Sequence, residues 1–236
     1  MLRQTARKMR IELVNAGFYH NEKEVFSNLN LSFKGGDLAV ITGDESSGKS
    51  ALFDLLRLKK RPFFGNVLID GKDPFENNKI RKMYRSYLGI VPEPGTYSLD
   101  IPLKKLIKAN REVSLRLKRG EYLTRMEEGR KFFRLSFDDD GVLGQLSRSE
   151  RIRFLLLLEM IRDPAVLLFD SVLSEAGDTW GEKIFLFSRK ICEDGRIIVM
   201  LERKLPLYLE KRATKLIEES GQFKLHTFYR KEEVTI

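Results

Sequence analysis

Two kinds of hydrophobic pattern divide this chain. Residues 10–34 alternate between apolar and polar side chains, with turn residues at Asn21 and at Gly35 and Gly36. Such alternation predicts short strands that bury one face. Four later segments are short and mainly apolar throughout, at residues 38–42, 67–70, 165–169 and 196–201. Apolar runs of this length are typical of strands buried on both faces of a parallel sheet.

Helical spacing of apolar residues appears between these strands. Residues 50–58 and 151–161 are apolar at helical intervals, and residues 100–135 show the same spacing in a segment rich in Lys, Arg and Glu. Strands that alternate with helices predict an α/β fold around a parallel sheet. The most apolar helix, at residues 151–161, is interrupted by Glu159. It is far shorter than the roughly 20 residues that a membrane-spanning helix needs.

Composition and charge exclude several classes of site and partner. The 236 residues contain one cysteine, Cys192, and two histidines, which excludes an internal disulfide and a cysteine-rich metal site and argues against a zinc enzyme. No apolar signal sequence follows the basic segment 1–10, so we expect the chain to remain in the cytoplasm. The net charge of +9 suits nucleic acid, an anionic membrane surface or a basic surface of no special role. Because the basic residues are scattered and no nucleic-acid-binding motif is found, we expect no nucleic-acid partner. Attraction to anionic lipid headgroups or to an acidic partner is the favoured use of the charge.

The strongest motif follows the strand predicted at residues 38–42. Residues 43–50, GDESSGKS, match the phosphate-binding loop GxxxxGK[ST], and a predicted helix follows them. In such a loop the glycines let backbone N–H groups curl around phosphate oxygens, and the helix directs its positive end at the same anion. A chance match in a chain of this length has a frequency on the order of one percent. The motif therefore predicts a nucleotide site.

The residues of this loop have distinct expected roles. Lys49 would reach the β- and γ-phosphates, and the hydroxyl of Ser50 would bind Mg²⁺. Asp44 and Glu45 share the sign of the phosphate charge and should point outward. The other predicted nucleotide contacts in the loop are Gly43, Ser46, Ser47 and Gly48.

A second element, at residues 165–170, is an apolar strand that ends in Asp170. Its carboxylate could hold Mg²⁺ through water. Many core strands end in an aspartate, so this element alone is a weak indication of a metal site. Together with the phosphate-binding loop earlier in the chain, it indicates a nucleotide site with a bound Mg²⁺.

Further segments lie at fixed distances from these two motifs. LGIVPEP occupies residues 88–94, LSRSERIRF begins at Leu146, and GRIIVMLER begins at Gly195. Ser147 lies 23 residues before Asp170, and Pro164 lies six residues before it. In order and spacing the chain resembles the ATP-binding subunits of ABC transporters over nearly its whole length, with these segments at the Q-loop, signature and switch positions. Within that family its spacing is most similar to the FtsE, LolD and MacB group.

The resemblance implies one ABC ATP-binding domain across residues 1–236. This domain would combine a P-loop NTPase α/β core, an N-terminal antiparallel β-lobe and a helical lobe near residues 94–160. The cofactors would be ATP and Mg²⁺, and Tyr19 is the first choice for stacking on the adenine, with Phe18 and His20 beside it. Aromatic residues at such positions also serve as core.

The resemblance implies partners as well. The chain would form a homodimer, or a heterodimer with another ABC ATP-binding subunit, in which Ser147 of one chain contacts ATP bound to the other. An integral membrane subunit would be the further partner. The chain would then be peripheral on the cytoplasmic face of the membrane.

The catalytic positions depart from the family pattern. Ser171 replaces the acid that polarises the attacking water, and Glu93 replaces the Q-loop glutamine. Glu93 would either weaken metal binding or itself join Ser50 and Asp170 as a metal ligand. Arg203 occupies the place of the switch histidine, unless a one-residue slip assigns that place to Glu202.

Further departures affect the contacts with phosphate and with a second subunit. Two signature glycines, the D-loop aspartate and a phosphate-contacting threonine are replaced by Arg148, Ser149, Gly177 and Ala51. Each change alone is compatible with neutral drift. Together, beside an intact phosphate-binding loop, they predict ATP binding with weak or absent hydrolysis, since loss of a positioned base costs roughly 10²–10⁴-fold in rate. The alternative is a regulatory or scaffold protein of ABC descent without a transport role.

Overall fold

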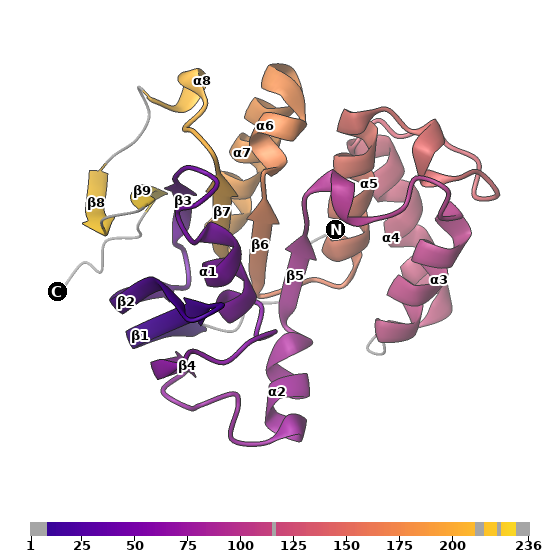
Figure 1. The fold of residues 1–236 in the computed structure, drawn as a ribbon. Helices are drawn as coiled ribbons and strands as arrows, with labels where there is room; N and C mark the ends of the chain where they lie inside the picture. Colours follow the sequence, from indigo (N-terminus) through magenta and orange to yellow (C-terminus); the bar gives the residue numbers. More distant parts are fainter. Residues whose placement is uncertain (1–8, 115–116, 211–214, 221–222, 230–236) are drawn as a thin grey trace, which may run out of the picture.

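The computed structural model describes residues 9–114, 117–210, 215–220 and 223–229, and it confirms the predicted α/β fold (Figure 1). The strands are β1 (Arg10–His20), β2 (Lys23–Lys34), β3 (Leu38–Thr42), β4 (Phe64–Ile69), β5 (Leu88–Val91), β6 (Val166–Asp170), β7 (Ile197–Glu202), β8 (Lys215–Ser220) and β9 (Phe223–Tyr229). The helices are α1 (Lys49–Leu56), α2 (Asn78–Arg85), α3 (Leu103–Val113), α4 (Arg119–Phe132), α5 (Arg148–Ile161), α6 (Val172–Glu175), α7 (Gly177–Cys192) and α8 (Leu207–Glu210), with 3₁₀ turns at Pro94–Thr96 and Leu143–Gln145.

The alternating N-terminal segment forms the predicted antiparallel β-lobe. Its three strands are ordered β2-β1-β4, and β1 pairs antiparallel with both neighbours. Asn21 and Glu22 form the turn between β1 and β2 with φ values of 47° and 63°. Two successive positive φ angles are characteristic of the two-residue hairpin turn that matches strand twist.

Three of the four continuous apolar segments form strands β3, β6 and β7 at the centre of a second sheet. The fourth, at residues 67–70, was wrongly expected there: it overlaps β4, which is only partly buried and belongs to the antiparallel β-lobe. The strands of the second sheet are ordered β5-β6-β7-β3-β9-β8, and the first four of them run parallel to one another. Every residue of β3 and of β7 is buried. Burial on both faces explains why their sequences do not alternate.

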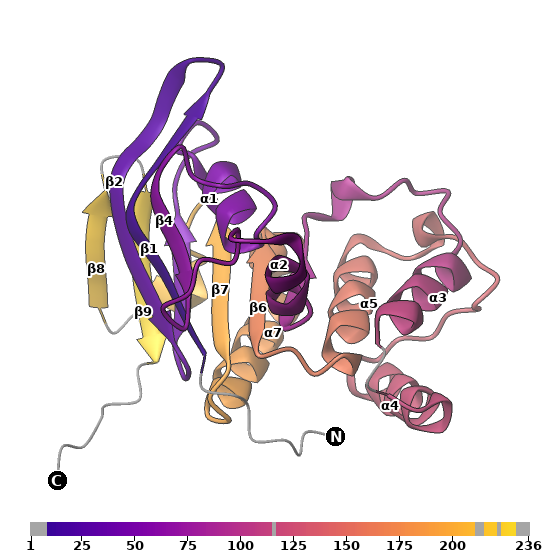
Figure 2. The ribbon, with the colours of Figure 1, turned by 90° about the horizontal axis from the view of Figure 1, so that it is seen from below.

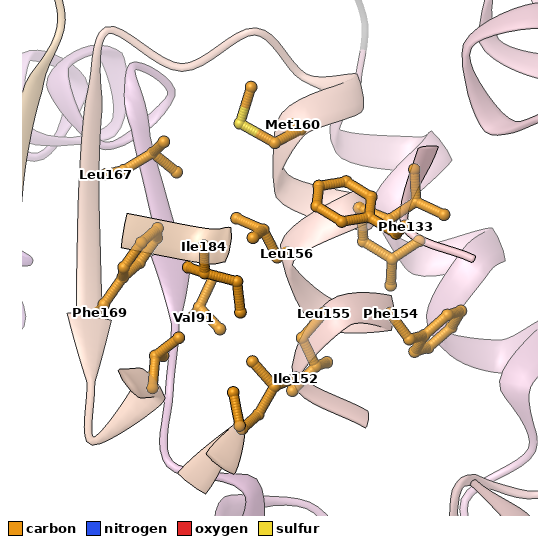
Figure 3. Close-up of a cluster of buried hydrophobic side chains, with 14 of the residues drawn as sticks. Val91, Phe133, Ile152, Phe154, Leu155, Leu156, Met160, Leu167, Phe169 and Ile184 are labelled. Atoms are coloured by element: carbon orange, nitrogen blue, oxygen red, sulfur yellow. The ribbon is translucent and has the colours of Figure 1, made fainter. Parts of the chain in front are cut away.

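Two hydrophobic layers cover opposite faces of this sheet. Ala39 and Ile41 of β3 pack with α1 and the β-lobe, whereas Leu38 and Val40 pack with α7 and α5. Figure 2 shows α1 and α7 on opposite sides of β6 and β7. Helices α3, α4 and α5 form a separate lobe beside β5 (Figure 1). The side chain of Leu156 in α5 lies toward Leu167, Phe169 and Ile184, so it joins this lobe to the sheet (Figure 3).

Several elements differ from the sequence-based expectation. The helical segment predicted at residues 100–135 is two helices, α3 and α4. Helix α5 begins at Arg148, before the predicted start, because Ser147 and Glu150 form a reciprocal capping box there. The patterns did not predict helices α2, α6, α7 and α8 or strands β5, β8 and β9. Among the described residues, no helix combines the length and apolar character required to cross a bilayer.

Candidate functional site

Four parallel strands end at the same edge of the large sheet, and each is followed by a residue singled out above (Figure 1). The loop at residues 43–50 follows β3, and Glu93 follows β5. Asp170 ends β6 opposite Leu201 of β7, and Glu202 ends β7 opposite Thr42. The parallel register therefore gathers the predicted nucleotide and metal residues at one edge.

The phosphate-binding loop is held tightly against the β-lobe. Gly48 has a φ of 86°, and a Cβ atom added there would lie 2.6 Å from Cγ1 of Val25 in β2. Glycine is therefore required both for its left-handed backbone and for the close approach of β2. This crowding fixes the loop at the start of α1.

Lys49 supplies the positive charge of the loop. Its ammonium donates hydrogen bonds to the carbonyl oxygens of Gly43 and Asp44, the latter at 2.7 Å, and to Oγ of Ser47 at 3.2 Å. Partial burial lowers the pKa of Lys49, although the charges of Asp44 and Asp170 oppose that shift. A desolvated ammonium is suited to bind an anion. Of the remaining residues of this segment, Ser46 and Ser50 are exposed and Ala51 is half-buried at the beginning of α1.

The two acidic side chains of the loop point outward, as predicted. Asp44 and Glu45 are both exposed. Nη2 of Arg203 lies 2.8 Å from Oε1 of Glu45, so the residue that follows β7 is tied to the loop that follows β3.

Asp170 and Glu93 form the acidic part of the site. Burial raises the pKa of Asp170, and the negative charge of Glu93 raises it further. A divalent cation near both carboxylates would relieve this repulsion. Among the described residues, no three acidic, histidine or cysteine side chains are grouped as a metal site. The pair thus fits a cation that takes its other ligands from phosphate, water and the Ser50 hydroxyl.

The altered catalytic positions line one cleft. Ser171, Glu93 and Arg203 border a hollow of about 590 Å³. Ser171 adopts a left-handed φ of 56°, and its N–H donates to the carbonyl oxygen of Leu201 at 2.7 Å. The structure therefore brings together the three substituted positions that sequence reasoning identified.

Glu202 has a different role from Arg203. Its side chain is fully buried and accepts hydrogen bonds from N–H of Leu173 at 2.7 Å, from N–H of Ser174 at 3.3 Å and from Oγ of Ser174 at 2.7 Å. It holds the first turn of α6, so its carboxylate is committed to this helix, whereas Arg203 reaches the phosphate-binding loop. Burial raises the pKa of Glu202 to about 7.

The signature segment begins α5. Oγ of Ser147 donates to a carboxylate oxygen of Glu150 at 2.6 Å and accepts from the N–H of Glu150 at 3.3 Å. These bonds lower the pKa of Glu150. Arg148 forms an ion pair with Glu175 in α6. The hydroxyl that is expected to meet ATP on a second subunit thus already has a carboxylate partner in its own helix.

An aromatic cluster lies at the end of the β-lobe. The ring of Tyr19 has its centroid 5.2 Å from that of Phe63 and 5.8 Å from that of Phe64. The exposed fraction is 70% for Phe63 and 54% for Phe64. The Tyr19 hydroxyl donates to Glu24 at 2.9 Å, next to the Val25 that contacts Gly48. Sequence reasoning missed the two phenylalanines, whose signal is an aromatic pair at the start of β4. Phe18, by contrast, is buried as core.

Comparisons with known proteins agree on one family. The sequence profile described as ABC transporter matches residues 26–174. ABC transporter B family member 13 of Arabidopsis thaliana is 29% identical over 206 residues, which cover 83% of this chain and 16% of that protein. The chain thus spans about a sixth of the length of this relative.

Solved structures share the fold. A dimeric bacterial ABC transporter cassette has a TM-score of 0.71 at 22% identity, over 82% of this chain and 88% of that one. The cbiO1 protein of Clostridium perfringens, part of the ABC transporter complex cbiONQ, has a TM-score of 0.68 at 20% identity, over 82% of this chain and 78% of that one.

The buried carboxylate at the end of β7 predicts a pH dependence of stability. The pKa of Glu202 rises on folding from 4.5 to about 7. Between these values the folded state holds a proton that the unfolded state has lost, so stability falls as pH rises through this window, by about 3 kcal/mol in all. Glu202→Gln should lack this slope. The difference between its unfolding free energy and that of the wild type should therefore shift in favour of the variant between pH 5 and pH 7.5. Urea denaturation at several pH values measures this difference. Ser174→Ala keeps the titrating group and should keep the slope, and parallel curves for wild type and Glu202→Gln would contradict the assignment.

Proposed function

Because the chain belongs to the ABC transporter family and carries its ATP-binding domain, we propose that it is the ATP-binding subunit of an ABC-type membrane complex. ATP binding would set its association with a second ATP-binding domain, and that association would control a membrane partner from the cytoplasmic face. The observation that supports this proposal is the loop at residues 43–50, where Gly48 is closely packed in a left-handed conformation and the Lys49 ammonium lies among the loop carbonyl oxygens.

The proposed roles of the nucleotide-site residues follow from their positions. Lys49 and the backbone N–H groups at the start of α1 bind the phosphates, while Tyr19 and the adjoining phenylalanines offer the aromatic surface for the adenine. Ser50, Asp170 and Glu93 would hold Mg²⁺, whose charge offsets that of the phosphates.

The proposed dimer places Ser147 and α5 against the nucleotide of the second subunit. A solved structure of similar fold is itself a dimeric cassette. Here Glu150 accepts the Ser147 hydroxyl hydrogen, and Arg148 is paired with Glu175. Arg148 places a cation at the position of a signature glycine, where it would help to bind the phosphates of the second subunit's nucleotide.

Slow turnover follows from the residues of the cleft. A serine hydroxyl at position 171 cannot remove a proton from water at neutral pH without a neighbouring base. Arg203 can neutralise the charge of a phosphate through a bidentate contact. That contact would exist in the bound ground state as well as in the transition state, so it strengthens binding more than catalysis.

A groove near the Q-loop position is the proposed membrane-partner site. Tyr97, Leu106 and Leu158 help to line a hollow of about 230 Å³ between β5, α3 and α5. Glu159 lies in its wall, paired with Arg162 at 2.8 Å, and burial raises the pKa of this carboxylate. The fold neighbour cbiO1 is part of a transporter complex, which supports a docking role for this lobe.

Lys49→Ala should abolish the binding of Mg²⁺·ATP and leave the fold intact, because the variant removes the desolvated ammonium from the loop. Isothermal titration at millimolar ATP measures binding, and circular dichroism checks the fold. Lys79→Ala, on the exposed face of α2, is the matched control and should bind as the wild type does. Failure of the wild type to bind would refute the proposed function at its base.

The purified chain should release phosphate slowly, well below one turnover per second, while ATP stabilises its association. Ser171→Glu alone should restore little activity, since Glu93 and Arg203 remain at the other two altered positions. Phosphate release is measured with Lys49→Ala as the contamination control. A Lys49-dependent rate of order one per second would show that another carboxylate acts as the base.

Tyr97→Arg should reduce the recovery of an integral membrane protein in pull-downs from membranes, because it places a bulky cation in the groove. Met83→Arg, which changes an exposed residue of α2, should leave recovery unchanged, and both variants should still bind ATP. If only soluble proteins are recovered with the wild type, the regulatory or scaffold alternative replaces the membrane-complex proposal.

A further inference from the structure

A second hollow lies away from the nucleotide edge, where the end of α4 meets α7. Its volume is about 390 Å³. Phe133 and Ile184 form part of its floor and belong to the main hydrophobic core, as Figure 3 shows. Because these side chains are fixed by the core, the hollow is a built feature of the fold rather than a gap between mobile side chains.

The walls of this hollow are aromatic and partly open to solvent. The centroid of the Phe132 ring lies 5.0 Å from that of Phe133 and 5.2 Å from that of Phe187. The exposed fraction is 56% for Phe132 and 44% for Leu186, and both side chains line the opening. A pocket that encloses a small molecule buries most of the ligand surface. Here the open apolar walls fit the core of a protein–protein contact, where aromatic residues are enriched.

The charge of the lining has a single sign. Arg134, Lys183 and Lys190 line the hollow, and no carboxylate is among its lining residues. All three cations are exposed. An apolar centre surrounded by cations is complementary to an apolar side chain flanked by acidic residues.

A buried arginine positions this arrangement. Nη1 of Arg153 in α5 donates to the carbonyl oxygens of Phe133 at 2.5 Å and of Arg134 at 3.0 Å. Its guanidinium also stacks on the Trp180 ring, 4.2 Å from the centroid, while Nζ of Lys183 lies 4.8 Å from the same centroid. Arg153 therefore ties the turn that carries Arg134 to the wall formed by α7.

We propose that this hollow docks an acidic peptide segment of a partner protein. The segment inserts one aromatic or large aliphatic side chain between Phe132, Phe187 and Leu186. Carboxylates on either side of that anchor pair with Arg134, Lys183 and Lys190. A bilayer surface fits this site less well, because the apolar residues lie in a concavity and the cations surround it. The inference does not depend on nucleotide binding, since the lining residues of this hollow and of the nucleotide-edge cleft are different.

The single tryptophan of the chain provides a direct probe, since Trp180 lines the hollow. The probe peptide is a hexapeptide of one phenylalanine and one leucine with two glutamates on each side. It contains no tryptophan, so the emission reports Trp180 alone. We expect a saturable change in emission, with a matching heat signal in isothermal titration. The apparent Kd should rise severalfold between 50 and 300 mM salt, because the pairs at the opening are exposed to screening.

Charge reversal tests the specificity of the contact. The double variant Lys183→Glu and Lys190→Glu should weaken binding of the acidic peptide at least about tenfold in isothermal titration. A matched double variant, Lys79→Glu and Lys82→Glu, makes the same change in net charge on exposed residues of α2 and should bind as the wild type does. Both variants should retain ATP binding, which separates this site from the nucleotide site.

Four outcomes would overturn the proposal. The first is no change in heat or emission at millimolar acidic peptide. The second is equal binding of a peptide in which lysines replace the glutamates. The third is equal weakening by the α2 control, which would mean that net charge alone attracts the peptide. The fourth is tight binding of phosphatidylserine vesicles that is lost with Lys183→Glu and Lys190→Glu, which would identify the hollow as a lipid-facing surface.

Discussion

Burial of four parallel strands on both faces is the constraint on which the rest of the structure depends. Because β3, β5, β6 and β7 run the same way, their carboxyl ends must meet at one edge of the sheet. In open sheets of this kind ligands bind in the crevice outside those ends. Because each strand is buried along its length, its position in the sheet fixes where the following loop or side chain lies at this edge. Lys49, Asp170 and Arg203 come together for this reason, although more than 150 residues separate the first from the last.

The charged residues at this edge form a network with two levels of burial. Glu202 is fully buried and bonded to the first turn of α6. The pair between Arg203 and Glu45 is exposed, so it adds little to stability and instead determines where the guanidinium lies. The two neighbouring residues at the end of β7 therefore connect different partners. One connects the sheet to the helix that precedes α7, and the other connects it to the phosphate-binding loop.

Much of this architecture could be predicted from sequence, and the failures have identifiable causes. Strands β3, β6 and β7 and the loop at residues 43–50 follow from local pattern, which long-range packing did not override. Strand β5 was missed, because its four residues form too short an apolar run to be recognised. Helix α7 was missed because its apolar residues are interrupted by Gly181 and by charged residues. The helical spacing of its apolar residues becomes visible only in the way they pack on the sheet. The partner of Glu202 could not be predicted, because periodicity shows that a polar residue ends a strand and does not show which element its side chain meets. Phe63 and Phe64 were missed because an aromatic pair is normally counted as core, and their exposure is visible only in three dimensions. The assignment to the FtsE, LolD and MacB group stays a prediction.

The backbone of Ser171 has a consequence for the start of α6. A left-handed conformation costs on the order of 1–3 kcal/mol for a residue that carries a Cβ atom, and position 171 has a φ of 56°. This conformation is held by the hydrogen bond from the Ser171 N–H to Leu201 and by the bonds from the N–H groups of Leu173 and Ser174 to Glu202. Glycine alone would relieve the strain, whereas other side chains at this position would carry it as serine does. The turn is therefore maintained by the main chain around it, so that a change of side chain at position 171 alters the chemistry of the cleft more than it alters the fold.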